Sequence, residues 1–186
     1  RFCSSRLIHT GGWQKTTMAL IVAEELGIPV TNLEVTTGDT DVTSDTGSTG
    51  GSRGTPSTGL AMIAAAKDAK NQLLEAAAEI LKKKKEELEI RDGQIFIKGE
   101  EKAVPYQDIL SRTPSPIVGR GSGRPPRNVT MQVFGAHFAE VTVDTRTGKV
   151  ELVRLIAAHD VGRVINRLGC ENQIQGGSTM GIGFGL

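Results

Sequence analysis

A loop rich in glycine and hydroxyl side chains carries the clearest chemistry in this sequence. Residues 48–55 combine serines, threonines and glycines with a single guanidinium, that of Arg53. A long helix is expected to follow, so free backbone N–H groups, the helix dipole and Arg53 would together favour a phosphate or pyrophosphate. No GxxxxGK and no GxGxxG directly after a strand is present, which excludes a P-loop and a Rossmann turn. The alternative is a mobile, acidic Gly/Ser loop.

A second glycine cluster lies between Glu171 and Gly183. On a helix, Gln173 and Gly177 would share one face, because they stand at positions i and i+4. Small residues there would let a flat ligand or a neighbouring helix approach the backbone, and the Gln173 amide can donate and accept hydrogen bonds at once. Two interpretations therefore stay open, a surface for a heterocycle and tight helix packing through glycine.

The histidines do not form a recognisable metal site. His9, His137 and His159 are far apart in the sequence, and no HxH, HExxH or CxxC spacing occurs. His159 and Asp160 are adjacent, so in a strand they point to opposite faces and cannot orient one another as a hydrolase pair would. We therefore expect no metal ligands, and we interpret each histidine as a hydrogen-bonded, partly buried side chain.

Composition excludes several classes of protein. The 186 residues include 22 Lys and Arg and 21 Asp and Glu, for a net charge of +1, whereas nucleic-acid and anionic-membrane surfaces usually need a basic excess. Apolar residues make up 38%, which argues against disorder, and no run of 18 apolar residues could span a membrane. Glycine is unusually frequent, at 23 residues, and it is clustered rather than periodic.

The order of periodic segments predicts an α+β fold, with long helices packed on small mixed or antiparallel sheets. We expect one domain over residues 1–186, with a sub-division near the Pro- and Gly-rich connection 111–127. Because the sequence starts without Met and ends in glycine-rich sequence, we also expect it to be a piece of a larger protein. The predicted helices are 16–26, 56–88, 104–110 and 168–186, and the predicted strands are 33–37, 94–98, 131–143 and 149–157.

Six segments together resemble, in order and spacing, the molybdopterin-binding large subunit of the xanthine dehydrogenase/aldehyde oxidase family, in its second molybdenum-cofactor domain. The resemblance covers nearly the whole chain, and each segment alone is weakly specific. The segments are Val22-Ala-Glu-Glu-Leu-Gly27, Thr37-Gly-Asp-Thr-Asp41, Gly50-Gly-Ser-Arg-Gly-Thr55, Phe134-Gly-Ala-His-Phe-Ala-Glu-Val-Thr-Val-Asp144, Ala158-His-Asp-Val-Gly-Arg-Val-Ile-Asn166 and Gln173-Ile-Gln-Gly-Gly177.

The resemblance implies part of a molybdenum-dependent hydroxylase that oxidises a purine, an aldehyde or an aromatic heterocycle with water as the oxygen source. The cofactor would be molybdopterin, with a cytosine dinucleotide as one form, and the cofactor does the redox chemistry while the protein binds and orients it. Partners would be the rest of the large subunit, iron–sulfur and FAD subunits or domains, and a small-molecule substrate in the cytoplasm. The implied cofactor-binding residues are Gly50, Gly51, Ser52, Arg53, Gly54, Thr55, Gln173 and Gln14.

The sequence departs from the family pattern near its start. The family has a Gly-Gln-Gly turn before the first helix, and here the stretch reads Thr10-Gly-Gly-Trp-Gln14. The glutamine is either lost or represented by Gln14 after a shift. The resemblance places the family's catalytic glutamate beyond Leu186, so we assign no catalytic residue and expect the isolated chain to be inactive and to retain no cofactor. The alternative function is a non-catalytic nucleotide- or phosphate-binding module.

Overall fold

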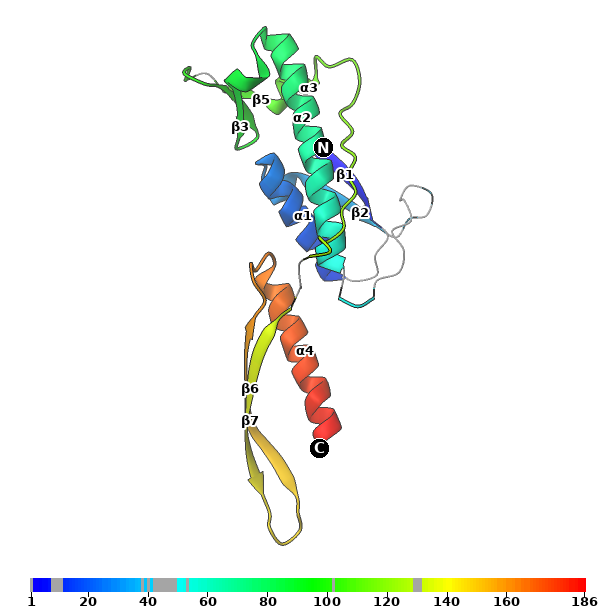
Figure 1. Ribbon diagram of the computed structural model, residues 1–186, viewed down its shortest axis with the longest axis vertical. Helices are drawn as coiled ribbons and strands as arrows, with labels where there is room; N and C mark the ends of the chain where they lie inside the picture. Colours follow the sequence, from blue (N-terminus) through cyan, green and yellow to red (C-terminus); the bar gives the residue numbers. More distant parts are fainter. Residues whose placement is uncertain are drawn as a thin grey trace. The chain divides into compact units, whose positions relative to one another are not determined.

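The computed structural model describes residues 2–7, 12–37, 39, 41, 50–52, 54–101, 103–128 and 132–186. The chain divides into two compact units, Arg1–Pro126 and Arg127–Leu186. Figure 1 shows helices and small sheets in both parts, in agreement with the predicted α+β class. The boundary lies at the end of the segment 111–127, and each unit is described separately below.

Unit 1 contains three α-helices among its described residues, with a parallel two-stranded sheet, β1–β2, and an antiparallel three-stranded sheet, β3–β4–β5. α1 and α2 pack against each other (Figure 1), and β1 and β2 bring the chain start beside the strand that follows α1. The elements are β1 Phe2–Leu7, α1 Gly12–Leu26, β2 Leu33–Thr37, α2 Gly59–Leu81, β3 Leu88–Arg91, β4 Gln94–Ile97, β5 Ala103–Pro105 and α3 Tyr106–Leu110.

The apolar face predicted for the first helix is buried. Met18, Ile21, Val22 and Leu26 of α1 all lie within the core, because their spacing places them on one side of the helix. A larger cluster joins α1, α2, the β3–β5 sheet and α3, with Ile95 and Ile109 fully buried. The apolar spacing in the predicted helix 56–88 places Leu60, Leu73 and Ala77 on one buried face. Leu73 and Ala77 are buried, whereas Leu60 is exposed and the prediction for that residue is wrong.

The predicted end of the second helix is wrong. We expected the helix to run to residue 88, but α2 ends at Leu81 and Lys82 adopts the left-handed conformation at φ 53°. The N–H of Lys83 donates to the Ala78 carbonyl and closes the helix end. The lysines 82–85 therefore lie outside the helix, and Leu88 is buried as the first residue of β3.

The predicted connection 111–127 is an extended segment that runs along α2. A Cβ added to Gly119, Gly121 or Gly123 would overlap the backbone of α2, so side chains are excluded at these alternate positions. Facing them are alanines at every fourth position of α2, namely Ala61, Ala65 and Ala69. Two residues of extended chain rise about 6.6 Å and four residues of helix rise about 6 Å. Because these two distances are similar, each successive glycine of the segment lies beside the next alanine along the helix.

The residues on either side of Gly119 are held by polar side chains of α2. The Arg120 N–H donates to Oδ2 of Asp68 over 2.9 Å, and Nε2 of Gln72 donates to the Val118 carbonyl over 3.0 Å. Gln72 also donates to Asp68 over 3.0 Å, so these two side chains are joined to each other as well as to the backbone of the segment. The segment is thus bound to the helix by close backbone contact and by side-chain clamps.

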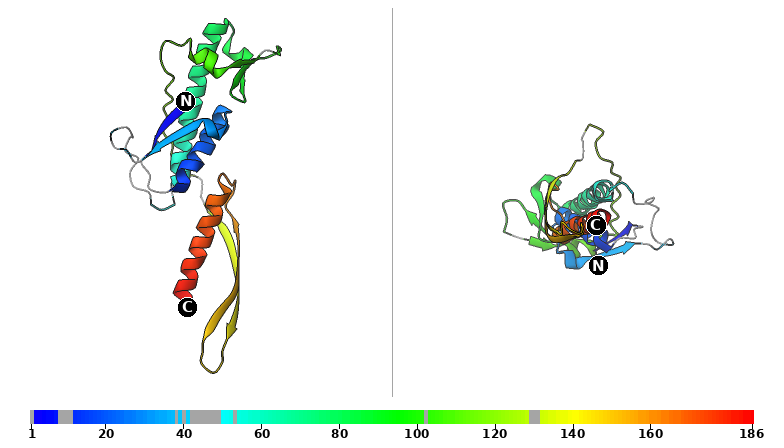
Figure 2. Two further views of the ribbon diagram at one scale, coloured as in Figure 1. Left: turned by 180° about the vertical axis from the view of Figure 1, so that it is seen from behind. Right: turned by 90° about the horizontal axis from the view of Figure 1, so that it is seen from below.

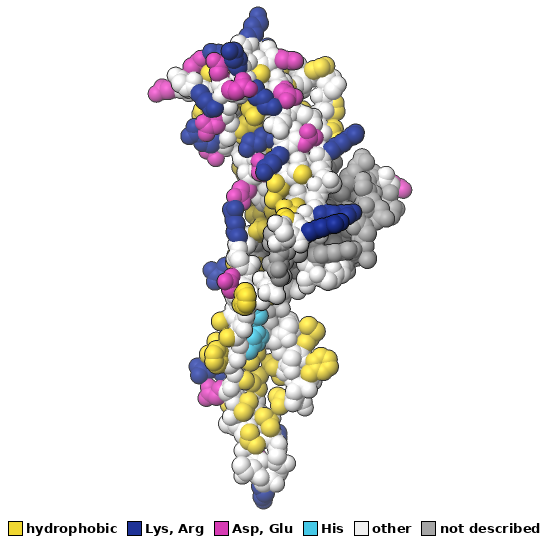
Figure 3. All heavy atoms as spheres, viewed as in Figure 1, with side chains coloured by type: hydrophobic (Ala, Val, Ile, Leu, Met, Phe, Trp, Pro, Cys, Tyr) yellow, Lys and Arg dark blue, Asp and Glu magenta, His cyan; other side chains and the backbone are white. Residues whose placement is uncertain are grey.

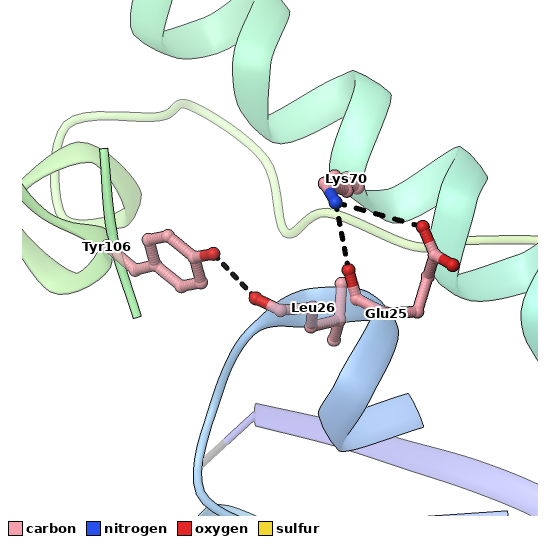
Figure 4. A network of polar contacts seen from close by, with 4 residues as sticks. All are labelled: Glu25, Leu26, Lys70 and Tyr106. Carbon is pink, nitrogen blue, oxygen red and sulfur yellow. Dashed lines mark hydrogen bonds and ion pairs between the residues drawn. The ribbon is translucent and has the colours of Figure 1, made fainter. Parts of the chain in front are cut away.

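Two contacts tie the C-terminal end of α1 to other elements of unit 1 (Figure 4). The buried Tyr106 hydroxyl donates to the Leu26 carbonyl over 2.7 Å. Nζ of Lys70 donates to the Glu25 carbonyl over 3.1 Å and lies 3.8 Å from Oε1 of the same residue. Both groups satisfy carbonyls that have no partner within the helix, since the last turn of a helix leaves them open.

Replacing Tyr106 with phenylalanine is expected to lower the free energy of unfolding by about 1–2 kcal/mol, since it leaves the Leu26 carbonyl without its buried donor. Burial raises the pKa of Tyr106. The advantage of the wild type should therefore be complete below the ordinary tyrosine pKa of about 10 and decline as the pH rises beyond it. Urea unfolding at several pH values measures this difference in stability.

Ser111→Ala is the control, because it removes only an exposed hydrogen bond from a hydroxyl to a carbonyl and should change stability little. Equal losses of stability in the two variants would contradict the prediction.

Unit 2 is a long hairpin with one helix along it, as Figure 1 and the rear view in Figure 2 both show. The hairpin consists of β6 Phe134–Val143 and β7 Val150–Asp160, and the helix is α4 Arg167–Gly185. The predicted turn is confirmed, because Gly148 has φ +75° and the Asp144 carboxylate accepts the N–H groups of Arg146 and Thr147. Asn166 caps α4 by accepting the Gly169 N–H over 3.1 Å.

Unit 2 exposes many large apolar side chains, which Figure 3 shows as yellow atoms along the hairpin and helix. Phe138 is 66% exposed, Met180 65% and Phe184 94%. Contiguous exposed apolar surface of this kind usually marks an interaction surface. In the described part of the chain, no helix is both long and apolar enough to cross a membrane.

Candidate functional site

Gln14 and Gly54, two of the predicted cofactor residues, lie in direct contact within unit 1. Gln14 belongs to the first turn of α1, and Gly54 opens a five-residue π-helical turn, Gly54–Thr58, that leads into α2. A Cβ on the buried Gly54 would stand 2.9 Å from Cδ of Gln14 and closer still to Nε2. Glycine at this position therefore lets the Gln14 amide lie against the backbone.

The Gln14 amide has an unsatisfied acceptor. Its Oε1 atom is buried and has no hydrogen-bond partner among the described residues. Leaving a buried carbonyl oxygen unpaired costs about 1–3 kcal/mol, so such an atom usually has a donor from a ligand or a bound water. The sequence predicted a ligand contact for Gln14, but it gave no indication that Gly54 is its neighbour.

Gly50, Gly51 and Ser52 form an open turn before Gly54. Gly51 and Ser52 both adopt left-handed backbone conformations, with φ +59° and +56°, and all three residues are exposed. A Cβ on Gly50 or Gly51 would meet nothing within 4 Å, so a ligand can reach this backbone closely. Thr55 is also exposed, whereas Arg53 lies outside the described residues.

α2 continues directly from the π-helical turn Gly54–Thr58, so the helical donors nearest to an open end are those at Gly54 rather than those at Gly59. Thr58, at its N-cap, has helical backbone angles and makes no side-chain cap hydrogen bond. Pro56 lies in the π-helical turn rather than in the first turn of α2, where it was predicted. The arrangement offers exposed backbone at Gly50–Ser52, whose N–H groups can donate to an anionic group, and at Gln14 an amide oxygen that can accept a hydrogen bond from a polar ligand.

Gln173 lies in the other unit, on the exposed surface of α4. The prediction that α4 is a helix with Gln173 and Gly177 one turn apart is confirmed. A Cβ added to Gly176, Gly177 or Gly181 would meet nothing within 4 Å, so tight helix packing through these glycines does not occur within the described residues. Gln173 and residues 50–55 belong to different units, so the implication that they bind one cofactor together stays a prediction.

A cleft of about 420 Å³ separates α4 from the hairpin. Its lining is mostly apolar, and Gly177 and Gly181 keep the helix side open. Oγ of Ser178, which also lines the cleft, is buried without a hydrogen-bond partner among the described residues. The sequence analysis missed Ser178, because a serine within a glycine-rich helix carries no pattern of its own.

The prediction that the histidines are partly buried is wrong for two of them, and the third, His9, lies outside the described residues. His137 on β6 and His159 on β7 are exposed, but their Nε2 atoms are hydrogen-bonded over 2.7 Å. Within the described ranges, no three His, Cys, Asp or Glu side chains gather in a group that could hold a metal ion.

Residues 7–186 match the family described as "Molybdopterin cofactor-binding domain", and the chain therefore belongs to that family. The resemblance to the molybdopterin-binding subunits of the xanthine dehydrogenase family is confirmed. The carbon monoxide dehydrogenase large chain of Afipia carboxidovorans is 33% identical over 177 residues, which cover 91% of this chain and 22% of the relative.

Other curated relatives act on different compounds. The xanthine dehydrogenase molybdenum-binding subunit of Escherichia coli O157:H7 is 30% identical over 92% of this chain and 24% of the relative. The 6-hydroxypseudooxynicotine dehydrogenase complex subunit gamma of Paenarthrobacter nicotinovorans is 28% identical over 96% of this chain and 24% of the relative. The chain thus spans about a quarter of the length of the relatives it matches.

Solved structures show the same fold. The crystal structure of the Cu,Mo-CO dehydrogenase in its carbon monoxide reduced state superimposes with a TM-score of 0.77 at 32% identity, over 91% of this chain and 22% of that one. Quinoline 2-oxidoreductase from Pseudomonas putida 86 has a TM-score of 0.74 at 24% identity, over 92% of this chain and 23% of that one, and shows the fold alone.

Proposed function

We propose that this chain forms part of the cofactor cradle in the large subunit of a molybdenum hydroxylase. The observation that best supports this proposal is the position of the Gln14 side chain. It lies against Gly54, and its Oε1 atom is buried without a hydrogen-bond partner among the described residues. When bound, molybdopterin supplies the two-electron redox centre. Oε1 of Gln14 would accept a hydrogen bond from the pterin ring system, and the backbone N–H groups of Gly50–Ser52 would donate to an anionic group such as its phosphate.

The substrate class we propose is a purine, an aldehyde or an aromatic heterocycle, hydroxylated with oxygen from water. Two of the relatives are named as a complex subunit and as a large chain, which supports partner subunits for this protein. Iron–sulfur and FAD subunits or domains are the partners that we propose from the family resemblance. Cytosine dinucleotide is one proposed form of the cofactor, and the cytoplasm is the proposed location. The family resemblance places the catalytic glutamate beyond Leu186, so we propose that the isolated chain neither turns over substrate nor retains molybdenum.

Replacing Gln14 with alanine in the full-length protein should lower cofactor affinity about 10–100-fold, the loss that follows when a hydrogen bond to a charged or strongly polar group is removed. Gln14→Glu should lower it further, because a carboxylate would repel an anionic ligand. Molybdenum and pterin content per polypeptide, measured after dilution, report the affinity. Gln107→Ala, an exposed glutamine on α3, is the matched control and should retain the wild-type content.

Unchanged molybdenum and pterin content in both Gln14 variants would contradict the proposal. Retention of inorganic phosphate by the wild-type chain, with no pterin in the full-length protein, would instead support the alternative of a non-catalytic phosphate-binding module. The exposed turn Gly50–Ser52 is the feature that both functions would share.

A further inference from the structure

The proposed function assigns no role to two histidines of unit 2, although imidazole side chains can bind metal ions. His137 and His159 lie on the same face of the hairpin, because His137 pairs with Ala157 and His159 pairs with Gly135. Their Nε2 atoms are 2.7 Å apart, and the two rings are nearly perpendicular, at 82°. Both side chains are exposed, so an ion from solution can reach them.

Gly135 positions one of the two rings. A Cβ on Gly135 would stand 2.7 Å from both Cε1 and Nδ1 of His159, so the imidazole lies directly on the strand, and a larger residue at position 135 would push the ring out of this position. The ring is thereby packed against β6 with its Nε2 next to His137. Donor atoms that are already adjacent lose little conformational freedom when they bind a ligand.

We propose that His137 and His159 chelate a divalent transition-metal ion such as Zn²⁺ or Ni²⁺, with water at the remaining positions. Imidazole is a good ligand for these ions. Metal–nitrogen bonds of about 2.0–2.1 Å at angles of about 90–110° separate two ligand nitrogens by about 2.9–3.4 Å. The two Nε2 atoms, observed 2.7 Å apart and pointing at each other, need to move apart by less than about 1 Å, and each ring needs to turn by about 35–45° so that both lone pairs meet at the ion.

Binding of the ion requires one hydrogen of the histidine pair to change position. In the hydrogen-bonded pair, one Nε2 carries a hydrogen and the other accepts it. When the ion binds, that hydrogen moves to Nδ1 of the same ring, so that both Nε2 lone pairs face the metal. No redox partner is needed, and the bound ion would connect β6 to β7 across the hairpin.

Calorimetric titration of the untagged full chain with Zn²⁺ tests the proposal. One ion should bind per chain, and His137→Gln or His159→Gln should weaken binding at least tenfold, since glutamine keeps a polar side chain but lacks the imidazole. His9→Ala, which removes the third histidine of the sequence, is the matched control and should bind Zn²⁺ as the wild type does. Circular dichroism verifies that each variant folds.

A second readout does not depend on any variant. Substoichiometric Ni²⁺ should broaden the imidazole proton resonances of His137 and His159 first among the proton resonances of the chain, because paramagnetic broadening falls steeply with distance from the ion. Absence of Zn²⁺ binding, loss of binding in His9→Ala, or unchanged affinity in both glutamine variants would each overturn the proposal. So would nickel broadening that begins elsewhere.

Discussion

Valine in place of Gly121 is expected to unfold unit 1 or to detach the extended segment from α2. A Cβ at this position would stand 2.6 Å from the Ala61 carbonyl oxygen and closer still to the Ala65 nitrogen. Both neighbours are helix backbone, which cannot rotate aside as a flexible side chain could. Overpacking a well-filled site typically costs about 1–3 kcal/mol, and a β-branched residue against rigid backbone should cost at least the upper value.

Urea unfolding followed by far-ultraviolet circular dichroism measures this loss, and amide hydrogen exchange of α2 shows where protection disappears. Val118→Ala is the control in the same segment, since the Val118 side chain is 56% exposed and should change stability by less than about 0.5 kcal/mol. A Gly121→Val variant as stable as Val118→Ala would show that the segment does not lie on α2 in solution.

Replacing Ile95 with alanine should cost about 2–5 kcal/mol of unfolding free energy, the second large effect we expect. Ile95 is the fully buried centre of β4, and it packs in the cluster that includes Leu73 and Ile109. Removing its side chain leaves a cavity among residues from α2, the sheet and α3. The loss should therefore appear in the unfolding of unit 1 as a whole rather than in the sheet alone.

The matched control makes the same chemical change on an exposed site. Ile156 on β7 is 49% exposed, so Ile156→Ala should alter stability by less than about 1 kcal/mol. Both variants can be compared with the wild type by urea unfolding under identical conditions. Equal losses in the two variants would mean that Ile95 is not part of a packed core.

Local sequence patterns predicted those helices and turns that are defined by residues close together in the chain. The apolar spacing of Met18, Ile21 and Val22 is sufficient to define a buried helix face, and Gly148 marks the hairpin turn by its own backbone requirement. The end of α2 was mispredicted because lysines are good helix formers. What stops the helix is the burial of Leu88 in β3, and that is a tertiary effect.

The candidate site was predictable only as a set of positions. The family resemblance identified Gln14 and Gly54 individually, but their contact joins residues that are distant in sequence and depends on how α1 packs near the start of α2. The pairing of His137 with His159 required the register of the hairpin, in which each histidine stands two residues from the position opposite the other. No spacing motif encodes such a diagonal pair.

The alternation of Gly119, Gly121 and Gly123 has a consequence for how this sequence can change length. A single-residue insertion between Gly119 and Gly123 would exchange the residues that face α2 with those that face away from it, from the insertion onward. A side chain would then point at the helix backbone where a glycine now lies. A two-residue insertion would preserve the alternation if its inward residue were also glycine. Length variation in this region should therefore occur in even steps, whereas the tip of the β6–β7 hairpin faces no such constraint.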